Sequence, residues 1–88
     1  MKINDNFVLR QVAGTWVVLS VAVENVDFNG MLTLNETGLM LWKLLEKGSS
    51  REALAQALTE EYDVTYAQAL SDVDEYLGKL ERAGCLER

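Results

Sequence analysis

The hydrophobic pattern of the chain changes character after its first 34 residues. Two runs rich in β-branched and aromatic residues, 7–12 (FVLRQV) and 15–21 (TWVVLSV), are separated by the short turn Ala13-Gly14. This arrangement predicts a β-hairpin. Residues 31–34 (MLTL) follow a polar, turn-rich stretch and predict a short third strand.

From Asn35 onward, apolar positions recur with the spacing of amphipathic helices. Asn35, Ser49 and Thr65 are predicted N-caps, because a short polar side chain can accept a hydrogen bond from the free N–H groups of a first helical turn. Gly48 and Gly84 are predicted stops, since glycine readily adopts the positive φ of a helix C-terminus. We therefore expect three helices, which start near Glu36, Arg51 and Tyr66. The predicted buried faces are Gly38, Leu41, Trp42 and Leu45, then Leu54, Ala57, Leu58 and Tyr62, then Leu70, Val73, Leu77 and Leu80.

The predicted order of elements is strand, strand, strand, helix, helix, helix. The last two helices are joined by only a few residues, as in a helix-turn-helix. The predicted fold class is therefore α+β and winged helix-turn-helix-like, with a three-stranded antiparallel sheet followed by three helices. Residues 1–88 suffice for one domain and not for two. Residues 1–6 carry no clear pattern and are candidates for disorder.

The charge balance narrows the classes of partner. The chain has 8 Lys and Arg against 14 Asp and Glu, a formal net charge of −6 at pH 7. Affinity for nucleic acid depends largely on basic side chains that neutralise phosphates, so we expect neither nucleic acid nor an anionic membrane as the main partner. No signal peptide is visible, and the apolar stretch 15–23 is shorter than the roughly 20 residues of a spanning helix. The expected location is the cytoplasm.

The residues that most enzymes need are scarce. The chain has no histidine and one cysteine, Cys85, so neither the commonest general base nor a cysteine metal cluster is available. Cys85 is interpreted as a small apolar residue that completes the core. The carboxylates of the predicted helices are interpreted as solvated faces. We therefore expect no enzyme activity, no metal and no cofactor.

The third predicted helix argues against DNA recognition. In a DNA-binding helix-turn-helix this helix enters the major groove and presents basic or amide side chains near its N-terminus. Here no basic residue occurs before Lys79, and Asp72, Asp74 and Glu75 precede it. The third predicted strand, residues 31–34, suggests a different use. It is uncharged, and if it lies at a sheet edge, an extended peptide could pair with it as an added strand.

Four segments carry motifs of a known kind: residues 32–38 (LTLNETG), 41–45 (LWKLL), 62–64 (YDV) and 80–86 (LERAGCL). Together these segments resemble the PqqD-like proteins, whose name refers to pyrroloquinoline quinone biosynthesis. The first two are fairly specific, and the resemblance extends over about residues 5–87. It implies a winged-helix-like domain that recognises the precursor peptides of ribosomally made, post-translationally modified natural products.

The resemblance also implies how such a domain works. The leader segment of the precursor would add to the third strand and pack on the third helix, and the domain would present the core segment to a maturation enzyme such as a radical SAM enzyme or a peptidase. A homodimer is compatible with this role. The peptide-binding residues carried over by position are Met31, Leu32, Thr33, Leu34, Gln68, Asp72, Val73, Tyr76 and Lys79. The acidic third helix favours a leader with some Lys or Arg, although Lys79 works against this.

Two other functions stay open at this stage. An acidic winged-helix regulator could bind DNA or a subunit of RNA polymerase, and a small interaction or oligomerisation module could have this composition. The acidic third helix favours peptide recognition over the regulator.

Overall fold

The computed structural model describes residues 1–21 and 31–87, with Met31 described by its backbone. Three strands form an antiparallel sheet in the order β2 (Phe7–Val12), β3 (Thr15–Ser20), β4 (Met31–Leu34). Three helices follow, α1 (Glu36–Lys47), α2 (Arg51–Glu61) and α3 (Tyr66–Arg82). The predicted α+β, winged helix-turn-helix-like architecture is confirmed. None of the described helices is both long enough and apolar enough to cross a membrane.

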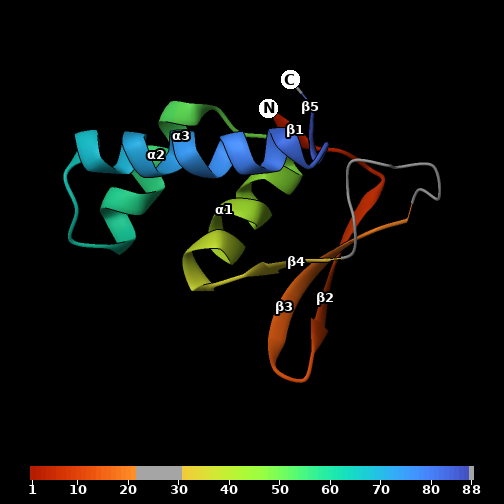
Figure 1. Cartoon of the computed structure of the whole chain (residues 1–88). Helices are drawn as coiled ribbons and strands as arrows, with labels where there is room; N and C mark the ends of the chain where they lie inside the picture. Colours follow the sequence, from red (N-terminus) through yellow and green to blue (C-terminus); the bar gives the residue numbers. More distant parts are fainter. Residues whose placement is uncertain (22–30, 88) are drawn as a thin grey trace.

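The β2–β3 hairpin extends away from the helices, as Figure 1 shows at the bottom of the view. Its turn has two residues, because Val12 pairs with Thr15. Ala13 and Gly14 both have positive φ, 52° and 81°, which is the geometry that matches the right-handed twist of two paired strands. Among the described residues β4 pairs with β3 alone, so both β2 and β4 are edge strands of this sheet.

The hydrophobic core lies between the sheet and the helices. Alternate residues of the strands point into it, and the buried members are Phe7, Val18 and Leu34. The helices bury Leu41, Trp42, Leu45, Leu54, Ala55, Leu58, Ala69, Val73, Leu77 and Leu80. Three details of the predicted faces differ. Tyr62 is only partly buried. Ala55 is buried in place of Ala57, and Leu70 is only partly buried beside Ala69. Ala55 and Ala57 both fit the helical period, as do Ala69 and Leu70, and contact with the neighbouring helix determines which residue of each pair is buried.

The helix caps agree with the sequence at two of three positions. The side chain of Asn35 accepts from the Gly38 N–H at 2.8 Å, and that of Thr65 accepts from the Gln68 N–H at 3.1 Å. The cap of α2 is Ser50, not Ser49, since Ser50 Oγ accepts from the Ala53 N–H at 3.0 Å. The backbone N–H of Ser49 donates instead to the carbonyl of Met1. This contact with a distant residue holds Ser49 outside the helix.

The two ends of the chain meet in a second, two-stranded sheet, which the sequence pattern did not indicate. β1 (Lys2–Ile3) pairs antiparallel with β5 (Leu86–Glu87), and the two termini lie together in Figure 1. The Asn4 N–H donates to the Cys85 carbonyl at 2.7 Å. Ile3 is 5% exposed and belongs to the core. The suggestion that residues 1–6 are disordered is therefore corrected: Lys2–Ile3 form a strand, and Ile3 packs in the core.

Cys85 is fully buried, as the interpretation of this residue as part of the core required. Burial raises the pKa of its thiol to about 11. The thiol is thus neutral near pH 7 and shielded from reagents in the folded domain.

Candidate peptide-binding groove

A groove of about 460 Å³ lies between β4 and α3. One wall is the edge strand β4, and the other is one side of α3. The base is formed by residues from the first half of α1 and by Leu58 of α2. The lining residues are Leu32, Thr33, Leu34, Asn35, Thr37, Gly38, Leu41, Leu58, Asp72, Glu75, Tyr76, Lys79 and Leu80.

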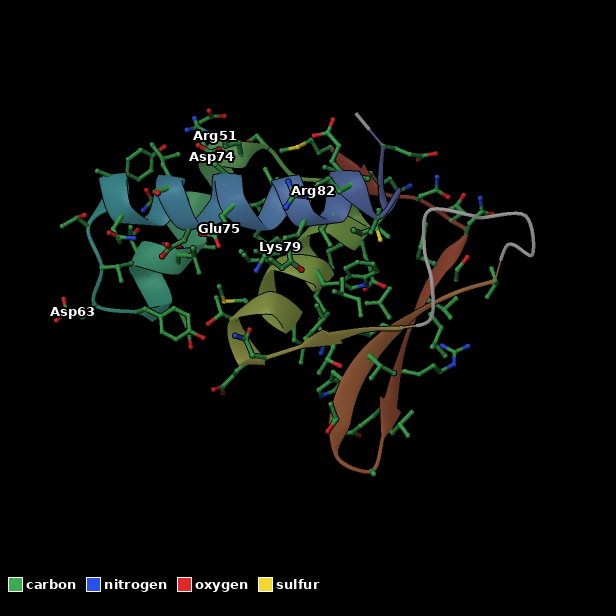
Figure 2. The ribbon with its side chains drawn as sticks, viewed as in Figure 1. Arg51, Asp63, Asp74, Glu75, Lys79 and Arg82 are labelled. Carbon is green, nitrogen blue, oxygen red and sulfur yellow. The ribbon has the colours of Figure 1, made fainter. Side chains whose placement is uncertain are left out.

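The α3 wall follows directly from helical geometry. Asp72, Glu75, Tyr76 and Lys79 are spaced i, i+3, i+4, i+7, so they lie on one face of the helix. The core face of α3, which includes Val73, is turned into the protein. Figure 2 shows Glu75 and Lys79 on the side of α3 toward α1 and β4, with Asp74 on the opposite side.

Tyr76 connects the wall of the groove to its base. Its hydroxyl donates to the Gly38 carbonyl at 2.8 Å. A Cβ at position 38 would lie 3.2 Å from Asn35 Oδ1 and would crowd the cap of α1, whereas its distance of 3.5 Å from Tyr76 Cε1 is an ordinary contact. Burial raises the pKa of the Tyr76 hydroxyl, and the nearby Cys85 adds to the effect. The hydroxyl therefore stays protonated and available as a donor.

The charged groups of α3 divide between its two sides. On the groove side, Lys79 Nζ lies 4.0 Å from Glu75 Oε1, and Asp72 Oδ1 accepts from the Gln68 amide at 2.9 Å. On the far side, the Arg51 guanidinium binds both carboxylate oxygens of Asp74. The hydrogen bond from Arg51 lowers the pKa of Asp74. Asp74 thus belongs to an ion pair between α2 and α3 and not to the groove.

Six of the nine predicted peptide-binding residues come together in this groove: Leu32, Thr33, Leu34, Asp72, Tyr76 and Lys79. The side chain of Met31 lies outside the described residues. Gln68 is one turn before the groove and contacts it only through Asp72. Val73 is fully buried in the core, so it cannot contact a peptide in this conformation and instead holds α3 in place.

Seven lining residues were not predicted from the sequence: Asn35, Thr37, Gly38, Leu41, Leu58, Glu75 and Leu80. Glu75 could have been found, because it has helical spacing to Asp72 and Lys79. Leu41, Leu58 and Leu80 look like ordinary core positions in the sequence, and only their meeting at the base of the groove distinguishes them.

Among the described residues, no group of three His, Cys, Asp or Glu side chains is placed to hold a metal ion. Over the same residues, no polar or charged side chain is buried. The groove combines an apolar base, a polar rim and an open strand edge, which are features of a surface that binds an extended peptide.

These features define a small winged-helix-like domain with a groove beside an edge strand. The family model described as coenzyme PQQ synthesis protein D (PqqD) matches residues 15–86. The chain therefore belongs to the PqqD family, as the motifs at residues 32–38 and 41–45 suggested.

Two solved structures extend the comparison. One is TbiB1 in complex with the TbiA(beta) leader peptide, with a TM-score of 0.82 and 28% sequence identity over 99% of this chain and 95% of that chain. The other is lasso peptide synthetase B1 complexed with the leader peptide, with a TM-score of 0.79 and 23% identity over 99% of this chain and 96% of that chain. The second shows the shared fold. No curated protein sequence matches the chain significantly.

Proposed function

We propose that this domain is a non-catalytic binding protein that captures the leader segment of a ribosomally synthesised precursor peptide. The leader pairs with β4 as an additional antiparallel strand, and its inward side chains enter the groove. The observation that carries this proposal is that the open edge of β4 is also one wall of the groove. The similarity to TbiB1, which was solved with a leader peptide, supports it.

The edge of β4 suits this role better than the edge of β2. In an antiparallel ladder, alternate residues direct their N–H and C=O groups to opposite sides of the strand. Two of the four residues of β4 therefore direct these groups away from β3. β2 is longer, but none of its residues lines the groove. A peptide on β4 gains backbone pairing and side-chain contacts together, whereas β2 offers pairing alone and stays open for self-association.

The expected affinity follows from these contacts. Two outward residues of β4 allow about four main-chain hydrogen bonds, each worth about 0.5–1.5 kcal/mol net. One or two apolar side chains of the leader, placed over Leu41, Leu58 and Leu80, would add about 1.5–3 kcal/mol each. After the cost of ordering the peptide, a dissociation constant between micromolar and tens of nanomolar is expected.

The second partner in this proposal is the enzyme that modifies or cleaves the precursor, of the radical SAM or peptidase kind. The bound leader occupies one edge of the domain, so the core segment that follows it extends into solvent. The domain would thereby raise the local concentration of the core segment at the enzyme. We place this step in the cytoplasm, where precursor peptides are made.

The test is an NMR titration of the domain with the leader peptide encoded beside its gene. Amide shifts should cluster on β4 and α3, and shifts elsewhere would contradict the proposed site. Leu32→Pro and Thr33→Pro then distinguish the open edge of β4 from the edge paired with β3, because adjacent residues direct their N–H groups to opposite edges. The proline variant at the residue whose N–H faces the open edge should fold and lose binding, since proline removes that donor.

The other edge provides the matched control. Arg10 and Gln11 are adjacent exposed residues of β2. One of these two residues directs its N–H to solvent. Its replacement by proline, Arg10→Pro or Gln11→Pro, should give a domain that folds and binds the leader with unchanged affinity. Equal loss of binding from both edges would indicate a general effect on the sheet and would reject strand addition at β4.

A further inference from the structure

The charges that line the groove are unevenly balanced. Among the residues that the structure describes, the charged groups of the lining are Asp72, Glu75 and Lys79, all on α3. The opposite wall, β4 and the start of α1, contributes uncharged side chains such as Thr33 and Thr37. The electrostatic character of the groove therefore depends on these three α3 residues.

Lys79 does not make the groove basic, because Glu75 lies beside it. Their charged atoms are 4.0 Å apart, and the two side chains are 62% and 73% exposed. Such a pair is weak and exchanges readily with other partners. Asp72 accepts one hydrogen bond from the Gln68 amide through Oδ1. No cation within the described part of the chain pairs with Asp72, so the lining carries one net negative charge at this carboxylate.

The distance from this charge to the apolar base of the groove determines how many residues separate the basic and the apolar side chain of a bound peptide. Side chains on one face of a strand recur every two residues, about 7 Å apart. One turn of α3 separates Asp72 from Tyr76, a rise of about 6 Å for four residues. In the view of Figure 1 the axes of β4 and α3 are roughly aligned, with the two chain directions opposite. Successive inward side chains of a strand on β4 therefore meet successive turns of α3.

We propose that the groove selects leader segments in which a Lys or Arg lies two residues from the apolar side chain that fills the groove. The basic side chain pairs with Asp72 and draws Glu75 away from Lys79, so that two carboxylates face one peptide cation. This inference rests on the proposed function and adds the class of peptide that the site takes. Asp72 is the principal specificity-determining residue, and Glu75 assists it.

The expected size of the preference follows from the exposure of the site. Replacing the basic peptide residue by Gln should weaken binding by about fivefold, the upper range for an exposed ion pair. The difference should shrink as salt is added, since charges at this surface are screened. Lys79→Ala should strengthen the preference, because it releases Glu75 from its partner.

The experiment is selection from a phage-displayed library of random peptides against the purified domain. The wild-type domain should enrich peptides with an apolar residue and a Lys or Arg two positions apart. The Asp72→Lys domain should lose the basic residue from its enriched set and gain Asp or Glu there. The Asp72→Asn domain, which retains the shape and the contact with Gln68, should keep the apolar position and lose the basic one.

Asp63→Lys is the matched control, because it makes the same change in charge at an exposed loop residue far from the groove in Figure 2. This variant should enrich the same peptides as the wild type. Enrichment of peptides with no basic position, or an unchanged motif with Asp72→Lys, would overturn the charge inference and leave peptide binding standing. Failure of every domain to enrich peptides would overturn both the inference and the proposed function.

Discussion

At the scale of single residues, the contact between Tyr76 and Gly38 fixes the position of α3 at the groove. The hydroxyl reaches across from α3 to the first turn of α1 and donates to a main-chain carbonyl at 2.8 Å. The sequence could identify Tyr76 as a residue near a peptide, because it lies off the core stripe of its helix. The sequence could not identify the partner, which is 38 positions earlier and contributes only its backbone.

Tyr76→Phe tests the importance of this contact for stability. The ring is retained and the hydrogen bond is lost, so the free energy of unfolding should fall by about 1 kcal/mol. Tyr66→Phe is the matched control. Tyr66 is 42% exposed, and its hydroxyl has no partner among the described residues, so its removal should change stability very little. The measurement is chemical denaturation of both variants, and equal values for the two would show that the Tyr76 hydrogen bond adds nothing.

At the scale of elements, the sequence predicted most of the fold because most of its signals are local. The switch from β-branched runs to helical periodicity, the caps at Asn35 and Thr65 and the stop at Gly48 depend on neighbouring residues. The features that were missed depend on distant ones. β1 and β5 have two residues each, too few for a pattern, and each forms only through pairing with the other. In the same way, Ser49 is displaced from its predicted cap by Met1.

Ser50→Ala and Ser49→Ala compare the observed cap of α2 with the predicted one. Loss of the Ser50 hydroxyl leaves the Ala53 N–H without its 3.0 Å acceptor and should lower the free energy of unfolding by about 1 kcal/mol. The hydroxyl of Ser49 donates only to the Ser50 carbonyl at 3.2 Å, at an exposed position, so its loss should have a much smaller effect. Thermal and chemical unfolding of the two variants decide between them. A larger cost for Ser49→Ala would restore Ser49 as the cap.

At the scale of the whole molecule, a winged helix-turn-helix architecture is combined with charges unsuited to DNA. The fold places α3 where a DNA-binding relative would have its recognition helix. The groove side of α3 presents Asp72 and Glu75, and Lys79, the cation among the described lining residues, lies near Glu75. The opposite side presents Asp74, which Arg51 neutralises. Along α3, acidic side chains therefore outnumber basic ones, which opposes contact with phosphates.

We expect no sequence-selective binding of duplex DNA at physiological salt. Neutralising the charge of phosphates depends on Lys and Arg, and the chain has 8 such residues against 14 acids, for a net charge of −6. Fluorescence anisotropy with labelled duplexes should show no submicromolar binding, and the weak association that appears at low salt should vanish as salt is raised. A variant with Asp72→Lys and Glu75→Lys supplies the positive comparison, since it makes the groove side of α3 basic and should bind duplexes more tightly without regard to sequence. Submicromolar, sequence-selective binding by the wild-type domain would instead support an acidic winged-helix regulator and count against the peptide-binding role of α3.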